Sequence, residues 1–198
     1  FHNSGNIPVV RRAVFPFFSH QELESLPTGG WGYDHFPFTA KYTAGLGVDF
    51  LGMTGKFHTT WGEFGGFKHP DALRYECAAM LAFGAKCSIG DQLHPSGKMD
   101  ESTYRIVGEA YKEVEEKEPW CIGSSNVAEI ALLSVTGNEE RLGSCWDPAN
   151  RDHASETGAS RILLEGHFLF DVVDDEMDFS SYRMLVLPDE IVVDSFLQ

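Results

Sequence analysis

Short apolar segments and longer amphipathic segments alternate along residues 1–119. The short segments are apolar throughout or alternate apolar with polar positions, which is typical of strands. They are residues 9–18, 20–26, 48–58 and 86–91. The segments with helical spacing of apolar residues are 36–47, 69–86 and 100–119. This pattern predicts an α/β architecture of consecutive βα units, in which a loop and a helix follow each strand.

The helix predicted at 69–86 shows clear signals at both ends. Pro70 suits the first helical turn, and Gly84 is a typical residue at a helix end. One apolar side of this helix is formed by Leu73, Cys77, Met80 and Leu81. The next helix, at 100–119, has an acidic polar face, and we expect Pro119 to stop it.

Two acidic residues lie at the end of the strand predicted at 20–26. Glu22 and Glu24 are two positions apart, so in a strand their side chains point to the same face. A glycine-rich turn with three large or acidic side chains follows directly: Trp31, Tyr33 and Asp34. Because βα barrels keep their chemistry at the carboxyl ends of their strands, this arrangement predicts the mouth of a barrel.

Residues 127–198 form a second series of strand-like and helix-like segments. The expected elements are strands at 127–135, 170–175 and 182–190, a loop at 150–160 and a helix at 159–168. The apolar run 185–187 is typical of a parallel strand buried on both faces. This order is similar to the opening half of a flavodoxin-like, doubly wound domain. No G-x-G-x-x-G follows the first of these strands, which disfavours a nucleotide-binding function.

Composition narrows the possible functions. Of the 198 residues, 42% are hydrophobic and 13% are aromatic, which is enough for a sizeable core. The formal net charge of −15 argues against a nucleic-acid partner, because phosphate binding requires a basic surface. No apolar run reaches the length of about 20 residues that a membrane-spanning helix needs, so we expect no membrane partner.

Cysteine, histidine and serine motifs are also informative. None of the four cysteines has C-x-x-C spacing, and Cys77 and Cys87 lie among core-like neighbours, so we interpret them as buried thiols of a reduced, cytoplasmic protein. The histidines form no H-E-x-x-H spacing, and we expect neither a catalytic metal nor a cofactor. The absence of G-x-S-x-G disfavours a serine hydrolase.

Several long stretches carry a resemblance to a known family. They are residues 22–38, 52–76 and 83–97 in the first part of the chain and 162–176 and 182–190 in the second. The first three resemble the C-terminal half of a glycoside hydrolase (β/α)8 barrel, as in bacterial α-L-fucosidases. The last two resemble the start of the β-galactosidase-type trimerisation domain that follows such a barrel.

The resemblance implies a layout for the chain. Residues 1–119 would be the C-terminal part of the barrel, 120–126 a linker, and 127–198 the N-terminal part of a structural trimerisation domain. Strands five to eight would then be present and strands one to four absent. Since glycosidases need two carboxyl groups around the scissile bond, and one is commonly on the fourth strand, we expect this fragment to be inactive alone.

The resemblance and the positions at strand ends together indicate candidate site residues. Glu24 is the first candidate for a catalytic carboxylate, with Glu22 beside it. One of the two could instead bind sugar hydroxyls or form a salt bridge with Arg11 or Arg12. The substrate-binding candidates are Trp31, Tyr33, Asp34, Lys56, His58, Trp61, Glu63, Asp91 and His94. Trp61 could offer an apolar platform to a sugar or simply pack its loop, and Asp91 could line the pocket or cap the following loop.

We therefore expect a glycoside hydrolase that acts on oligosaccharides or glycosides with carboxylate chemistry. α-L-Fucosidase activity is the first hypothesis. The alternatives are a β-galactosidase of the same superfamily and a non-catalytic carbohydrate-binding or assembly module. A homotrimer is implied by the resemblance alone.

Overall fold

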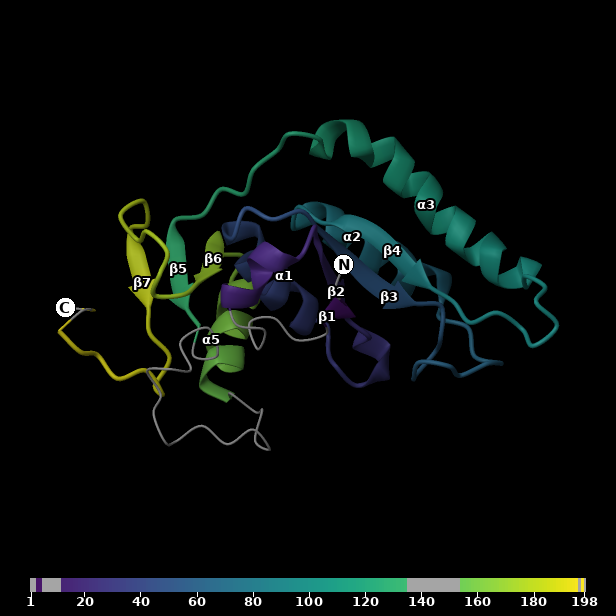
Figure 1. Ribbon diagram of the computed structural model, residues 1–198, viewed down its shortest axis with the longest axis horizontal. Helices are drawn as coiled ribbons and strands as arrows, with labels where there is room; N and C mark the ends of the chain where they lie inside the picture. The colour runs from purple at the N-terminus through teal and green to yellow at the C-terminus, as the bar shows by residue number, and fades with distance from the viewer. Residues whose placement is uncertain (1–2, 5–11, 135–153, 196, 198) are drawn as a thin grey trace.

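The computed structural model describes residues 3–4, 12–134, 154–195 and 197, which form a mixed α/β structure with two parallel sheets (Figure 1). The first sheet contains strands β1 (Asn3–Ser4), β2 (Gln21–Glu24), β3 (Phe50–Gly55) and β4 (Lys86–Gly90). The helices associated with it are α1 (His35–Gly45), α2 (Pro70–Ala82) and α3 (Glu101–Cys121). The predicted α/β class with successive βα units is confirmed in this part of the chain.

The four strands of the first sheet lie side by side in chain order, and every pair is parallel. This order arises when each strand is followed by a crossover helix that returns the chain to the next position in the sheet. It is the strand order of a βα barrel, whereas a doubly wound sheet reverses its order at one point. The carboxyl ends of β2, β3 and β4 consequently lie along one edge (Figure 1).

All three helices cover the same face of this sheet. Leu23 and Phe50 of the strands pack with Phe36 of α1 and Met80 of α2 in the main core. A Cβ atom on Gly52 would lie 2.6 Å from Met80 Cγ and 2.7 Å from Phe36 Cε2, so only glycine lets both helices approach β3 this closely. The helices therefore leave the opposite face of the strands for other contacts.

Helix α2 begins and ends as predicted. Pro70 is its first residue, and the backbone N–H of Asp71 donates to Nδ1 of His69, which caps the helix. Gly84 takes φ = +83° just after the last turn, a conformation that favours glycine.

The prediction that Pro119 stops the third helix was wrong, because α3 continues to Cys121. Proline lacks its own N–H and its ring crowds the carbonyl four residues earlier, so its effect falls on the turn before it and not on the residues that follow. The next residues still find helical partners, and the N–H of Ile122 donates to the carbonyl of Glu118 at 3.2 Å. The linker expected at 120–126 therefore begins within the last turn of α3.

The strand predicted at 9–18 was also wrong where the structure describes it. Residues Arg12–Phe17 form the 3-10 helix η1, with Pro16 inside it. Proline has no N–H to give to a neighbouring strand, and its fixed φ suits a helical turn.

The second sheet contains β5 (Ile130–Leu133), β6 (Phe170–Val173) and β7 (Met184–Val186), with helix α5 (Ala154–Glu165) between the first two. The order is β6-β5-β7 and both pairs are parallel, which is how a flavodoxin-like sheet begins. Helix α5 starts within the segment predicted as a loop. The expectation that residues 185–187 are buried on both faces was wrong, since β7 is an edge strand of the described sheet and these residues are half-buried.

The two sheets share one core. Leu132, Phe170 and Val172 of the second sheet belong to the same cluster of buried residues as Leu23 and Phe50 of the first. Helix α1 lies between them and contacts both β2 and β6 (Figure 1).

Candidate active site

Glu22 and Glu24 lie on the same face of β2, opposite the helices. Their neighbours Gln21 and Leu23 are buried toward the helices, while the two glutamates are half-buried. Across the sheet, Glu24 is paired with Met53 of β3, and Met53 with Ser88 of β4. We call this face, defined by Glu22, Glu24, Met53 and Ser88, the carboxylate face. The alternation that placed both glutamates on one face is confirmed.

The guanidinium of Arg12, considered from the sequence as a salt-bridge partner of Glu22 or Glu24, binds another carboxylate. The guanidinium of Arg12 binds both carboxylate oxygens of Asp174, with Nε–Oδ2 at 2.9 Å and Nη2–Oδ1 at 2.7 Å. Arg12 also lies 3.6 Å from the Glu176 carboxylate. The Arg12 guanidinium therefore binds carboxylates in the second half of the chain, those of Asp174 and Glu176. Arg11 lies outside the described residues.

Trp61 lies at the carboxyl ends of β3 and β4. A Cβ atom on Gly90 would lie 2.1 Å from Trp61 Cη2, and one on Gly55 would lie 3.4 Å from Trp61 Cζ3. The indole contacts the Phe57 ring edge-on, with the ring centroids 5.0 Å apart. Trp61 nevertheless keeps 46% of its surface exposed. Trp61 therefore presents an exposed aromatic surface next to the strand ends.

The ammonium of Lys56 is buried in the loop that follows β3. Its Nζ donates to the carbonyl of Phe64 at 3.0 Å and lies over the rings of Phe57 and Phe67. The backbone N–H of Lys56 donates to the carbonyl of Gly90, which extends the pairing between β3 and β4. These contacts give Lys56 a role in shaping its loop.

Glu63 organises the same loop. Its carboxylate accepts hydrogen bonds from the backbone N–H and the hydroxyl of Thr59, each at 2.8 Å. These two bonds lower the pKa of Glu63, so it is ionised at neutral pH. His58, from the same set of candidates, is exposed.

The loop after β4 carries the last two candidates. The Asp91 carboxylate accepts from the backbone N–H of Gln92 at 2.7 Å, which is the capping role considered from the sequence. His94 Nδ1 lies 2.8 Å from the Ser96 hydroxyl, and its ring contacts Phe64 edge-on with centroids 5.6 Å apart. His94 therefore connects this loop to the loop after β3.

The loop after β2 holds the remaining candidates. Trp31 is exposed and contacts the His35 ring edge-on, and Asp34 directly precedes α1. A Cβ atom on Gly29 would lie 2.2 Å from the carbonyl oxygen of Thr59, so the loops after β2 and β3 are in direct contact. The structure thus brings these two loops together above the strand ends.

Sequence reasoning missed a buried ion pair behind this site. The side chains of Lys68 and Glu76 are 1% and 4% exposed, and Nζ lies 2.7 Å from Oε2. The Thr54 hydroxyl donates to the same oxygen at 2.6 Å and accepts from Lys68 Nζ at 2.7 Å. Tyr33 donates its hydroxyl to Glu76 Oε1 at 3.3 Å. The signal was available, because Glu76 follows Leu73 and precedes Met80 at helical spacing on the apolar side of α2.

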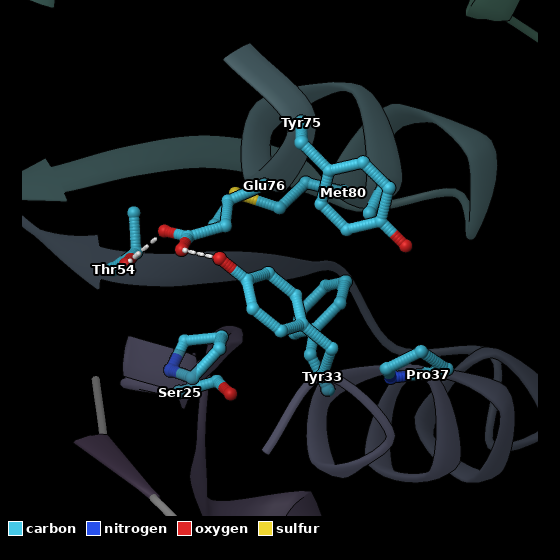
Figure 2. A pocket seen from close by; sticks show the side chains of 10 residues that line it. Ser25, Tyr33, Pro37, Thr54, Tyr75, Glu76 and Met80 are labelled. Atoms are coloured by element: carbon cyan, nitrogen blue, oxygen red, sulfur yellow. Dashed lines mark hydrogen bonds between the residues drawn. The ribbon is translucent and has the colours of Figure 1, made fainter. Parts of the chain in front are cut away.

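Figure 2 shows the small pocket beside this network, lined mainly by apolar atoms from α1, α2 and the loop after β2, with Thr54 of β3 at one side. Glu76 points down from α2 between Thr54 and Tyr33, and Ser25 lies on the opposite wall. Thr54 faces the helices, so the pocket is on the helix side of the sheet and not on the carboxylate face. We therefore assign this pocket to the supporting wall of the site.

Within the part of the chain that the structure describes, no three His, Cys, Asp or Glu side chains gather as a metal site would require. In the same residues, no helix has the length and apolar character needed to cross a membrane. The chemistry that the described site offers is that of carboxylates beside an aromatic platform. Such groups can exchange protons with, or attack, a glycosidic bond.

No model of a protein family and no curated protein sequence matches the chain. Among solved structures, α-L-fucosidase isoenzyme 2 from Paenibacillus thiaminolyticus is 55% identical, with a TM-score of 0.89 over 100% of this chain and 29% of that protein. A catalytic mutant of Gan42B, a GH42 β-galactosidase from G. stearothermophilus, is 17% identical with a TM-score of 0.67. A second structure of Gan42B is 18% identical with the same TM-score, and each covers 87% of this chain.

The chain spans 29% of the length of each of these proteins. The match to Gan42B shows a common fold, and the match to the fucosidase adds a common sequence. The resemblance inferred from the sequence is thereby confirmed: over its entire length, this chain is similar to a segment of an α-L-fucosidase.

Proposed function

We propose that this chain is part of a glycoside hydrolase that removes terminal sugars, and that the sugar is α-L-fucose. The observation that carries the proposal is the pair Glu22 and Glu24 on the carboxylate face, beside Trp61 at the carboxyl ends of parallel strands. The support for fucose is the 55% identity to an α-L-fucosidase over the whole chain.

In the proposed mechanism, Glu24 is the catalytic carboxylate and Glu22 supports it. Glu24 lies nearer to the strand end, where the mouth loops converge. A glycosidase uses a second carboxyl group, and the distance between the two determines the stereochemistry. Carboxyl groups about 5 Å apart lead to retention, because one attacks the sugar, and a wider separation of about 6.5–9.5 Å admits a water molecule and leads to inversion.

The substrate-binding part of the proposal assigns a role to each loop. Trp31 and Asp34 line the mouth from the loop after β2, and His58, Trp61 and Glu63 do so from the loop after β3. Tyr33 and Lys56 support these loops, because their polar groups are bound to Glu76 and to the Phe64 carbonyl. Asp91 and His94 contribute from the loop after β4. The Gly29–Thr59 contact and the His94–Phe64 contact support this, since they hold the three loops against one another.

A β-galactosidase is the second candidate, favoured by the common fold with Gan42B. The test is hydrolysis of 4-nitrophenyl α-L-fucopyranoside and 4-nitrophenyl β-D-galactopyranoside by the complete gene product that contains this chain. We expect kcat/KM to be at least about tenfold higher for the fucoside, because specificity is the ratio of these values. A preference for the galactoside would overturn the fucosidase proposal, and hydrolysis of neither would overturn both.

We also propose that the complete protein is a cytoplasmic homo-oligomer, a trimer by the resemblance of residues 127–198. Apolar side chains near the start of this part support assembly, since Trp120 and Ile122 are 86% and 82% exposed. The free thiols of Cys77, Cys87 and Cys121 support a reducing compartment. Sedimentation equilibrium of the complete protein tests the trimer, and a monomeric mass would contradict it.

A further inference from the structure

Gly90 leaves the space that the Trp61 indole occupies, and Gly55 leaves space for the Phe57 ring that contacts the indole. At Gly90, an added Cβ atom would lie 2.1 Å from Trp61 Cη2 and 2.6 Å from Cζ3, and real Cβ atoms do not approach other atoms this closely. At Gly55 it would lie 2.9 Å from Phe57 Cδ2 and 3.4 Å from Trp61 Cζ3, so this glycine mainly makes room for Phe57. The indole therefore rests directly on the backbone of Gly90, and the Phe57 ring packs against Gly55.

These glycines lie on the same side of the sheet as the glutamates. Gly55 and Gly90 are paired in the register, and they follow the pair Met53–Ser88 along the two strands. Because successive residues of a strand alternate in direction, Gly55 shares the carboxylate face with Met53, the partner of Glu24. The indole consequently lies on the carboxylate face, just beyond the row that contains Glu24.

Other contacts hold the indole from its edge and from its own loop. Phe57 meets the ring edge-on with an interplanar angle of 63°. Gly62 follows Trp61 with φ = +81°, and a Cβ atom there would lie 3.1 Å from Gln92 Oε1. The ring is thus held from below and from one side, while 46% of the residue faces solvent.

We propose that Gly90, assisted by Gly55, is a positioning residue that seats Trp61 so that its exposed surface receives the apolar C–H face of the terminal sugar beside Glu24. This inference rests on the proposed function. A pyranose has one face rich in C–H groups, and an aromatic ring that is held still can cover that face with little loss of conformational freedom. Any side chain at position 90 would displace the ring from this position.

The test is Gly90→Ala in the complete gene product, with kcat and KM measured on the aryl glycoside that the parent hydrolyses. We expect kcat/KM to fall by about tenfold to a hundredfold, since small misplacements of substrate carry costs of this size. The matched control is Gly65→Ala in the loop that carries Trp61. Gly65 has no atom within 4 Å of its added Cβ and no positive φ, so this variant should keep the parent's activity.

A double-mutant cycle separates seating from a general loss of structure. If Gly90 acts through the indole, Gly90→Ala should have no further effect on kcat/KM once Trp61→Ala has removed the ring. An equal loss from Gly90→Ala in both backgrounds would overturn the proposal, as would parental activity in the single variant. Trp61→Ala also relieves the clash, so the double variant should fold even where Gly90→Ala does not.

Binding of L-fucose and D-galactose to the same proteins, measured by isothermal titration calorimetry, distinguishes failure of this inference from failure of the proposed function. One outcome is that the parent hydrolyses no glycoside but binds one sugar, and that Gly90→Ala and Trp61→Ala both weaken this binding about tenfold. The positioning role of Gly90 is then supported and the hydrolase proposal is refuted. If neither variant weakens binding, or if the parent binds neither sugar and hydrolyses neither glycoside, the positioning role of Gly90 is refuted.

Discussion

The Lys68–Glu76 pair shows how one buried interaction supports a site that it does not enter. Glu76 of α2 is bonded to Thr54 near the end of β3, to Lys68 of the following loop and to Tyr33 of the loop after β2. Burial and the neighbouring Glu76 carboxylate raise the pKa of Tyr33, so its hydroxyl remains a donor at neutral pH. The network therefore holds the loops after β2 and β3 against β3 and α2.

Replacing Glu76 by Gln should destabilise the chain strongly. The variant leaves the Lys68 ammonium buried without a charged partner, and breaking a buried pair in this way costs about 3–5 kcal/mol. Glu113→Gln is the matched control, since Glu113 pairs with Arg74 and Lys117 at the surface, where such pairs contribute about 0–1 kcal/mol. Urea unfolding measures both free energies. Equal losses in the two variants would contradict this account.

The site could be predicted from the sequence only where its geometry depends on residues that are close together in the chain. Glu22 and Glu24 could be assigned to one face because strand alternation fixes side-chain direction two residues away. The contact between Gly90 and the Trp61 ring could not be predicted, because it forms only when α2 and β4 bring Gly90 back beside the loop that carries Trp61. Lys68 was missed because a lysine in a polar loop gives no sign that a glutamate of the next helix will bury it.

At the scale of elements, most helices and strands followed from periodicity. Two errors involve prolines, and the others concern the start of α5 and the burial of β7. The strands β2, β3 and β4 and the helices α1 and α2 lie where spacing of apolar residues placed them. Pro119 did not end α3 and Pro16 lies inside η1. A proline constrains its own φ and N–H, so its effect depends on whether neighbouring residues can still make their hydrogen bonds.

Helix α3 depends on its cap, which gives a prediction at this scale. The Asp100 carboxylate accepts from the backbone N–H of Ser102 at 2.9 Å at the start of the helix. Asp100→Ala should lower the free energy of unfolding by about 1 kcal/mol, because an orphan N–H loses its partner. Asp100→Asn should retain most of this stability, since an amide oxygen also accepts the bond. Thermal unfolding of the three proteins tests this, and an Asn variant as unstable as the Ala variant would refute the capping role.

At the scale of the whole molecule, one polar cluster links the two sheets. Asp174 follows β6, is buried, and binds the Arg12 guanidinium with both oxygens. Tyr42 of α1 donates its hydroxyl to Asp174 Oδ2 at 2.7 Å. Burial and the Asp174 carboxylate raise the pKa of Tyr42 well above its usual value. With the shared core, this cluster fixes the second sheet against η1 and α1.

Removing the charge of this cluster should loosen that arrangement. Asp174→Asn weakens the bonds to Arg12 and Tyr42, and hydrogen bonds to a charged group are worth about 1.5–3 kcal/mol. The control is Asp178→Asn, because Asp178 is exposed and accepts hydrogen bonds from the backbone N–H and the hydroxyl of Ser180. Guanidinium unfolding should show a lower midpoint for Asp174→Asn and little change for Asp178→Asn. The same midpoint for both would show that the cluster does not join the sheets.

The central claim is that the carboxylate face is a site of sugar cleavage. The most direct measurement is kcat/KM for 4-nitrophenyl α-L-fucopyranoside with the complete gene product and its variants Glu24→Gln and Glu22→Gln. The control is Glu109→Gln, since Glu109 is an exposed residue of α3. Loss of a catalytic carboxylate should lower kcat/KM by about a hundredfold to ten-thousandfold in Glu24→Gln, and the control should match the parent. Parental activity in both Glu24→Gln and Glu22→Gln would contradict the account.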